Sequence, residues 1–126
     1  MHRRVSRVVC LALCAVVLTS VPAWAGDDVR RRGDCAGDGD WDLRVERIDR
    51  NTLKVRFKID DVDPGESWQV FISDNGVRVY SGTKVANREG ELRVRRKIAD
   101  RAGTDRIAAS GVNVADGTTC QGSVSF

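Results

Sequence analysis

Three carboxylates at alternate positions are the first residues in this sequence that could do chemistry. They lie in the run Asp38-Gly39-Asp40-Trp41-Asp42. A calcium loop of the EF-hand kind begins with this spacing. Leu43 occupies the position where that loop requires glycine, and Asp49 would have to replace its closing bidentate Glu. We keep the three Asp residues as a calcium candidate, with a hydrated acidic loop as the alternative, and assign no metal or cofactor.

Histidine chemistry is limited to one residue. The only His is His2, in a segment that we expect to be removed. A domain without His excludes Ser-His-Asp and Cys-His nucleophile sites and the common zinc sites. The sequence also contains no phosphate-binding glycine loop and no dinucleotide fingerprint. We therefore expect a protein that is not an enzyme.

The first 25 residues have the pattern of a secretory signal peptide. Three Arg residues within 1–7 precede an apolar run at 8–21, and Ala23-Trp24-Ala25 supplies small residues at the two cleavage positions. The apolar run is shorter than the ~20 residues that cross a bilayer. We expect cleavage after Ala25, a secreted protein, and no membrane span after cleavage.

Cleavage changes both the charge and the cysteine count. The full chain has 21 basic and 18 acidic residues, and three Arg leave with the signal peptide, so the remainder is neutral. A neutral total gives no general attraction to nucleic acid, which is not an expected partner, and any electrostatic function must come from patterning. Cys35 and Cys120 remain, and two Cys in an exported domain predict one disulfide.

The segments that we expect to position these residues show apolar and polar residues alternating with a period of two, as in β-strands. Residues 26–40 are rich in Gly, Asp and Arg without periodicity, which predicts an irregular arm. From Trp41 onward apolar and polar residues alternate, most regularly from Leu53 to Ile59. We expect seven short strands: 41–47, 52–59, the two arms of 67–82, 91–98, 106–114 and 119–126. Turns at this spacing favour an all-β sandwich or barrel.

The segment 67–82 predicts a hairpin around Asn75-Gly76, because a type I′ turn needs positive φ at both central residues. A two-residue turn pairs Ile72 with Val79 and places the apolar residues of both arms on one face, namely Trp68, Val70, Ile72, Val77 and Val79. It also places Phe71 opposite Tyr80 on the outward face. This exposed aromatic pair is a candidate recognition surface, and a stabilising cross-strand pair is the alternative.

The run Asp100-Arg101-Ala102-Gly103-Thr104-Asp105-Arg106-Ile107-Ala108-Ala109 resembles the Asp-x-Ala-Gly-x-Tyr-x-Cys corner of immunoglobulin domains. Asp105 stands in place of the corner Tyr, and Ile107 in place of the inter-sheet Cys. Residues 33–126 more broadly resemble small exported domains of GC-rich Gram-positive bacteria with an immunoglobulin or fibronectin III fold. The resemblance implies a seven-stranded immunoglobulin-like β-sandwich at 41–126, preceded by the arm at 26–40 and the signal peptide at 1–25.

In such a sandwich the strands at 41–47, 52–59 and 91–98 share one sheet. Their outward positions carry seven basic residues against the acidic Asp42, Glu46 and Glu91. The basic residues are Arg44, Lys54, Arg56, Lys58, Arg93, Arg95 and Lys97. A plate of this charge suits a polyanion, although cations on exposed strands also protect against edge-to-edge association.

The sequence therefore predicts a secreted binding or structural module whose partner is an anionic cell-envelope polymer or another extracellular protein. Two other functions stay open. A small-molecule carrier would need an apolar crevice between the sheets, and a proteinaceous enzyme inhibitor would need a rigid exposed loop. The tripeptide Arg32-Gly33-Asp34 matches an integrin-binding motif, but such a match is expected by chance in this composition.

Overall fold

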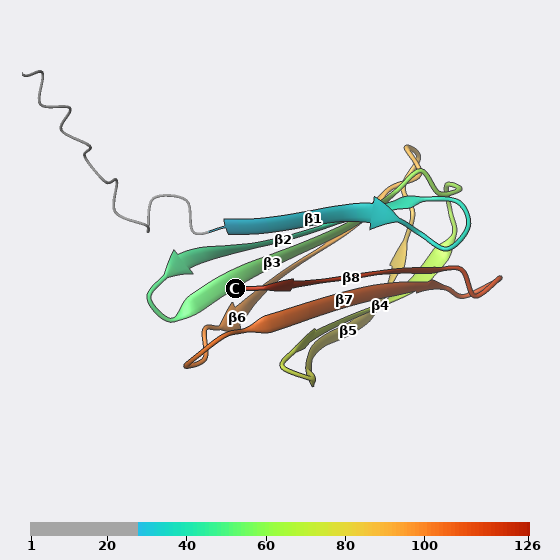
Figure 1. The fold of residues 1–126 in the computed structure, drawn as a ribbon. Coiled ribbons are helices and arrows are strands. Elements are labelled where there is room, and N and C mark those ends of the chain that lie inside the picture. Colours follow the sequence, from blue (N-terminus) through green and yellow to red (C-terminus); the bar gives the residue numbers. More distant parts are fainter. Residues whose placement is uncertain (1–27) are drawn as a thin grey trace, which may run out of the picture.

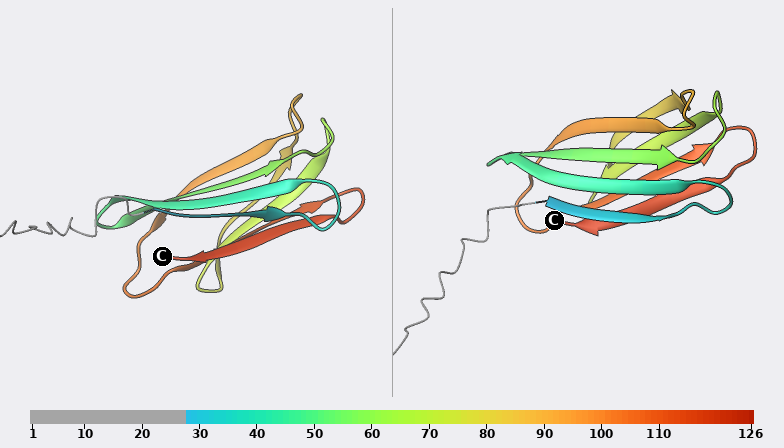
Figure 2. Two further views of the ribbon diagram at one scale, coloured as in Figure 1. Left: turned by 45° about the horizontal axis from the view of Figure 1, so that its top comes forward. Right: turned by 90° about the horizontal axis from the view of Figure 1, so that it is seen from above.

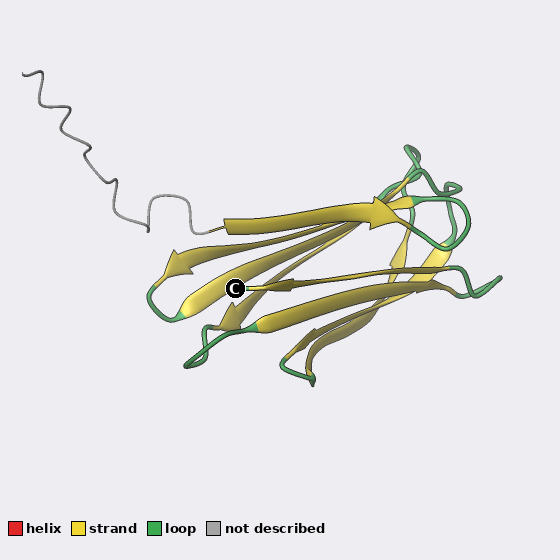
Figure 3. Ribbon diagram, viewed as in Figure 1, coloured by secondary structure: helices red, strands yellow, loops and turns green. Residues whose placement is uncertain are grey.

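A computed structural model describes residues 28–126, and the predicted signal peptide lies outside these residues. Within the described part of the chain there are eight strands and no helix (Figures 1 and 3). The strands are β1 (Asp28–Asp34), β2 (Asp40–Asp49), β3 (Thr52–Asp60), β4 (Ser67–Asp74), β5 (Val77–Val85), β6 (Leu92–Ala99), β7 (Arg106–Asn113) and β8 (Thr119–Ser125). None of the described residues forms a helix that could cross a membrane.

The strands form two antiparallel sheets that face each other as in a β-sandwich. One sheet has the order β1-β2-β3-β6 and the other has the order β5-β4-β7-β8. Alternate side chains of the central strands point into the space between the sheets and are buried there. These include Leu43, Val45, Leu53, Val55, Phe57 and Ile59 of the first sheet and Trp68, Val70, Ile72, Ile107 and Ala109 of the second. The alternation in the sequence thus decides which residues face outward.

The irregular arm that we expected at 26–40 is wrong over 28–34, because these residues form a strand. β1 pairs with β2 from Asp28↔Glu46 to Asp34↔Asp40, which raises the number of strands from seven to eight. Its inward positions are Val29, Arg31 and Gly33, which do not give the apolar alternation of a core strand. Pairing with β2, and not its own hydrophobic pattern, makes this segment a strand.

The hairpin between β4 and β5 has the predicted turn but not the predicted register beyond it. Asn75 and Gly76 both have positive φ, at 49° and 82°, and Asp74 pairs with Val77. A β-bulge then shifts the pairing, so that Ile72 lies opposite Tyr80 and not opposite Val79. The bulge lets the consecutive residues Val79 and Tyr80 both pack against the core, whereas a regular strand would turn one of them outward.

The predicted outward pair of aromatic residues is therefore also wrong. Phe71 lies opposite Ser81 on the outer face, where the guanidinium carbon of Arg78 sits 4.3 Å from the centre of its ring. Tyr80 faces the other way, and the guanidinium carbon of Arg96 lies 6.0 Å from its ring centre. The expectation that Val77 shares the core face fails as well, since Val77 is 50% exposed at the tip of the hairpin.

The two long edges of the sandwich are closed in different ways. At one edge β1 and β2 lie beside β8 (Figure 2), and the predicted Cys35–Cys120 disulfide joins the end of β1 to β8. Trp41 reaches across this edge and packs against Gly33 and Gly122. At the other edge β5 and β6 make few contacts. The disulfide and Trp41 thus hold the β1–β2 side of the first sheet to the second sheet, whereas the β6 side has few contacts with it.

Candidate functional site

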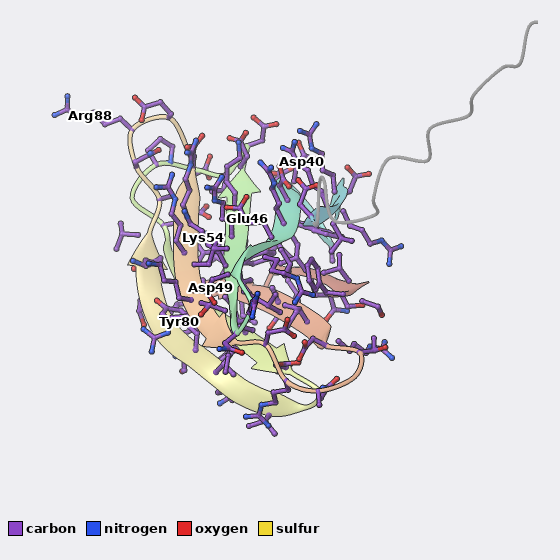
Figure 4. All side chains as sticks on the ribbon, turned by 90° about the vertical axis from the view of Figure 1, so that its left-hand side faces the viewer. Asp40, Glu46, Asp49, Lys54, Tyr80 and Arg88 are labelled. Carbon is purple, nitrogen blue, oxygen red and sulfur yellow. A yellow bond between two sulfur atoms is a disulfide. The ribbon has the colours of Figure 1, made fainter. Side chains whose placement is uncertain are left out.

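The outer surface of the first sheet forms what we call the basic face. Strand register arranges its side chains in three rows that cross the four strands. The first row is Arg30, Arg44, Arg56 and Arg95; the second is Arg32, Asp42, Lys58 and Arg93; the third is Asp28, Glu46, Lys54 and Lys97. These three rows, which define the basic face, carry nine cations against three carboxylates, and a fourth row on the same surface, Asp34, Asp40 and Asp60, is acidic and borders them. Figure 4 shows this surface in side view, with Glu46 and Lys54 on neighbouring strands.

All seven basic residues predicted from the sequence lie on this face, and the structure brings them together on three adjacent strands. The order β2-β3-β6 within one sheet is the arrangement that the prediction assumed. Sequence reasoning missed the contribution of β1, which adds Arg30, Arg32 and Asp28. The alternation of these three charged residues is visible in the sequence, but without apolar partners it gave no strand signal.

The β1–β2 half of the basic face is largely neutralised. Asp42 accepts hydrogen bonds from Arg30, including one of 2.9 Å from Nε to Oδ1, and lies 3.4 Å from Nε of Arg32. The hydrogen bonds from Arg30, together with its charge, hold the pKa of Asp42 below its usual value. Arg44 lies 2.8 Å from Asp28 and 3.8 Å from Glu46. Each of the three cations in this half therefore has a carboxylate partner.

The β3–β6 half is not neutralised to the same extent. Within residues 28–126, none of Lys54, Arg95 and Lys97 has a carboxylate oxygen within 4.0 Å. Lys97 contributes to the lowered pKa of Asp49, whose main cause is the backbone N–H of Asn51.

The other three cations of this half have partners at its margins only. Arg56 lies 3.2 Å from Glu46 of the neighbouring strand β2, and Lys58 lies 3.6 Å from Asp60. Arg93 lies 2.6 Å from Glu91, just before β6. No carboxylate stands between β3 and β6 in the three rows of the basic face.

A shallow hollow of about 210 Å³ lies on the basic face. Its charged lining consists of Arg30, Asp42, Arg44, Arg56, Lys58, Arg93 and Arg95. The Nε atom of Arg56 is buried at this place and has no hydrogen-bond acceptor among the described residues. A buried donor without a partner is unusual in proteins, and a concave, cationic surface is suited to an anionic ligand.

The calcium candidate is not brought together by the fold. β2 begins at Asp40, and Asp42 is engaged with Arg30 further along the same strand. Asp40 lies instead beside Asp61 and Asp34, and sharing hydrogen bonds with them raises its pKa, Asp61 being the larger influence. No group of three His, Cys, Asp or Glu side chains in the described part of the chain has an arrangement that could hold a metal ion.

A second hollow, of about 630 Å³, lies beside the disulfide and is acidic. Its lining includes Asp34, Asp38, Asp40, Asp61, Asp63, Glu66 and Asp116. Burial, together with the neighbouring Asp63, raises the pKa of Glu66. The side-chain N–H of Asn113 donates to Glu66 over 2.6 Å, so this carboxyl is held in place by the protein itself. The charge of this end is opposite to that of the basic face.

No protein-family model and no curated protein matches this chain. Among solved structures, it is similar to β-glucosidase 3B from Thermotoga neapolitana, in complex with glycerol, with a TM-score of 0.36 and 14% sequence identity. The similarity covers 77% of this chain but only 16% of that one, so the chain spans a small part of the glucosidase's length. At this TM-score the similarity carries no argument about fold or function.

Proposed function

We propose that this protein is exported and binds a polyanion through the β3–β6 half of its basic face, without catalysing a reaction. The observation that carries the proposal is the group of three cations, Lys54, Arg95 and Lys97, that have no carboxylate within 4.0 Å among residues 28–126. Cations that are already paired gain little from an external anion. Unpaired cations at fixed positions offer their full attraction.

Export and an immunoglobulin-like fold belong to the same proposal. Export rests on the pattern of the first 25 residues, and the Cys35–Cys120 disulfide supports it, since disulfides form in oxidising compartments. The order of strands β2 to β8 supports the fold assignment. β2, β3 and β6 share one sheet, and the other sheet has the order β5-β4-β7-β8. In an immunoglobulin-type sandwich the first, second and fifth strands share one sheet and the third, sixth and seventh share the other, as β2, β3, β6 and β4, β7, β8 do here. β1 adds an edge strand to the first sheet.

An anionic cell-envelope polymer is the partner that this surface fits best. The alternative of a small-molecule carrier would require an apolar crevice, whereas the hollow on the basic face is lined by seven charged side chains. An inhibitor would act through a rigid projecting loop, whereas the three unpaired cations lie on strands in the middle and at the edge of a sheet.

A salt titration with dextran sulfate tests the proposal, with uncharged dextran as the control ligand. We expect binding that weakens linearly on logarithmic axes as salt rises, because bound counterions are released. Replacing Lys54, Arg95 and Lys97 by Gln should lower the salt slope by about 3, one for each cation removed. Absent binding, or binding that salt does not weaken, would overturn the proposal.

The matched control variant replaces Arg30, Arg32 and Arg44 by Gln. It removes the same charge from the same sheet, but from side chains that are already paired. We expect its salt slope to fall by less than that of the first variant. Equal losses in the two variants would mean that total charge, and not the unpaired half, determines binding.

A further inference from the structure

The six cations of β3 and β6 form a ladder with three rungs. Strand register places Lys54 opposite Lys97, Arg56 opposite Arg95, and Lys58 opposite Arg93. Each rung thus consists of two cations on neighbouring strands. Like charges placed directly opposite each other destabilise a sheet, so three successive rungs of this kind are unfavourable for the fold taken alone.

Strand geometry sets the dimensions of this ladder. Neighbouring strands lie about 4.8 Å apart, and two residues along a strand advance by about 6.6 Å. The ladder is therefore about 13 Å long and about 5 Å wide. Along each of the two strands β3 and β6, the charged side chains of the ladder recur about every 6.6 Å.

The carboxylates that neutralise part of the ladder stand at its margins. Glu46 approaches Arg56 from β2, on the side away from β6. Asp60 and Glu91 approach Lys58 and Arg93 beyond the last rung. Only cations stand between β3 and β6. The hollow on the basic face covers the two rungs formed by Arg56, Lys58, Arg93 and Arg95, and it extends over β2 and β1 to Arg44, Asp42 and Arg30.

We infer that the ligand of this surface is a linear phosphodiester polymer that lies along β3 and β6, with its phosphates joined by short polyol units. The inference rests on the proposed function and names its ligand class. An extended chain advances by about 1.2 Å per bond, so about six bonds from one phosphorus to the next place the phosphates about 7 Å apart. A three-carbon polyol linker gives this repeat, which matches the interval between rungs. One phosphate then faces each rung.

The side chains of the ladder suit this ligand. Arg95 presents a planar guanidinium fork without a carboxylate partner within 4.0 Å among residues 28–126, and such forks bind phosphate oxygens through paired hydrogen bonds. Nε of Arg56, a buried donor without a hydrogen-bond acceptor among the described residues, lies at the middle rung.

The other possible direction is across the strands, along the row Arg30, Arg44, Arg56 and Arg95. Charges in that row recur at about 4.8 Å, and Arg30 and Arg44 already have carboxylate partners at 2.9 Å and 2.8 Å. A ligand lying across the strands would have to displace these pairs. Along β3 and β6, Arg56, Lys58 and Arg93 have carboxylate partners as well, but Lys54, Arg95 and Lys97 have none within 4.0 Å among residues 28–126. A ligand along the strands thus meets three unpaired cations, whereas the row across the strands offers only Arg95.

Synthetic oligomers of propane-1,3-diol phosphodiester test the inference on the wild-type protein. With one to six phosphates, we expect affinity to rise steeply up to three phosphates and only slowly beyond. With four phosphates and linkers of three, six or twelve carbons, the three-carbon oligomer should bind about tenfold more tightly than the twelve-carbon one, because only the short linker places successive phosphates on successive rungs. Equal affinity for all linkers, with dextran sulfate still bound, would overturn the ladder and leave the proposed function standing.

Two matched variants test the direction of the ligand. Replacing Lys58 and Lys97 by Gln removes one cation from each end rung, and should reduce the length dependence so that oligomers of one and three phosphates differ by less than in the wild type. Replacing Arg30 and Arg44 by Gln should leave the length dependence unchanged. The reverse result would show that the ligand lies across the strands. If neither dextran sulfate nor any oligomer binds, the proposed function itself is wrong.

Discussion

The two halves of the basic face belong to one sheet but differ in how their cations are held. In the β1–β2 half, each of Arg30, Arg32 and Arg44 has a carboxylate partner, and the disulfide ties this half to the second sheet. In the β3–β6 half, Lys54, Arg95 and Lys97 have no such partner among residues 28–126, and this half ends at the edge with few contacts to the second sheet. The comparison separates charge that stabilises the fold from charge that is available to a ligand.

The largest expected effect on stability comes from the Cys35–Cys120 disulfide, which lies on the β1–β2 side of the first sheet. The disulfide joins residues 85 apart in the sequence. In the chain-entropy model, closing a loop of this length stabilises the fold by about 4 kcal/mol. We expect replacement of Cys35 and Cys120 by Ala to lower the free energy of unfolding, measured by urea titration, by about this amount. An unchanged value would show that β1 and β8 are held together by packing alone.

The packing of Trp41 gives the next largest effect. A Cβ atom added to Gly122 would overlap the Trp41 ring, so Gly122→Ala should cost about 1–3 kcal/mol in the free energy of unfolding. Gly82→Ala, on the opposite edge, is the matched control. Its added Cβ would meet the hydroxyl group and the adjoining ring carbons of Tyr80, which is only partly buried, and we expect a smaller loss than in Gly122→Ala. Similar losses in both variants would mean that the two edges are equally tight.

Asp42 pairs with Arg30 and Arg32 in the β1–β2 half of the basic face, and the effect of removing its carboxylate on stability depends on pH. Its pKa is lowered in the folded state, so its contribution is complete above the ordinary value of about 4 and is lost as the pH falls through the lower, folded value. Asp42→Asn should cost about 0.5–1 kcal/mol at neutral pH, and the difference from wild type should shrink below about pH 4. Unfolding titrations at several pH values measure it.

Asp40 is the natural control, since it lies two residues earlier in the same strand and its pKa is raised by Asp61 and Asp34. A raised carboxyl pKa stabilises the protonated form, so ionised Asp40 opposes folding. Asp40→Asn should therefore leave stability at neutral pH unchanged or increased. A loss comparable to that of Asp42→Asn would contradict the assignment of the two carboxyls.

The smallest expected effect lies in the unpaired half. Arg95→Gln removes a cation that faces Arg56 without breaking an ion pair, and should raise the free energy of unfolding by a few tenths of a kcal/mol. Arg44→Gln, in the same row, breaks its pairs with Asp28 and Glu46 and should lower it by about 0.5 kcal/mol. Low-salt thermal unfolding detects both changes. A loss of stability in Arg95→Gln would mean that Arg95 supports the fold.

Sequence reasoning identified the basic residues of β2, β3 and β6 because their inward neighbours alternate so regularly. Leu53, Val55, Phe57 and Ile59 are all fully buried, which forces the intervening cations outward. β1 was missed because a segment with Arg31 and Gly33 at inward positions carries no such signal. The bulge at Val79 was missed for a related reason: alternation predicts the faces of a strand, but a single extra residue reverses them without changing the composition.

The sequence by itself determined the two-faced strands, the Asn75-Gly76 turn, the pairing of the two cysteines and the positions of seven outward cations. Only the tertiary structure decided which of those cations are available. β1 became a strand by closing the sheet beside β8, and its register with β2 placed Arg30 against Asp42 and Arg44 against Asp28. Ion pairs between strands depend on register and on which strand lies next to which. Periodicity along one strand contains no information about either, because both are set by the packing of the two sheets.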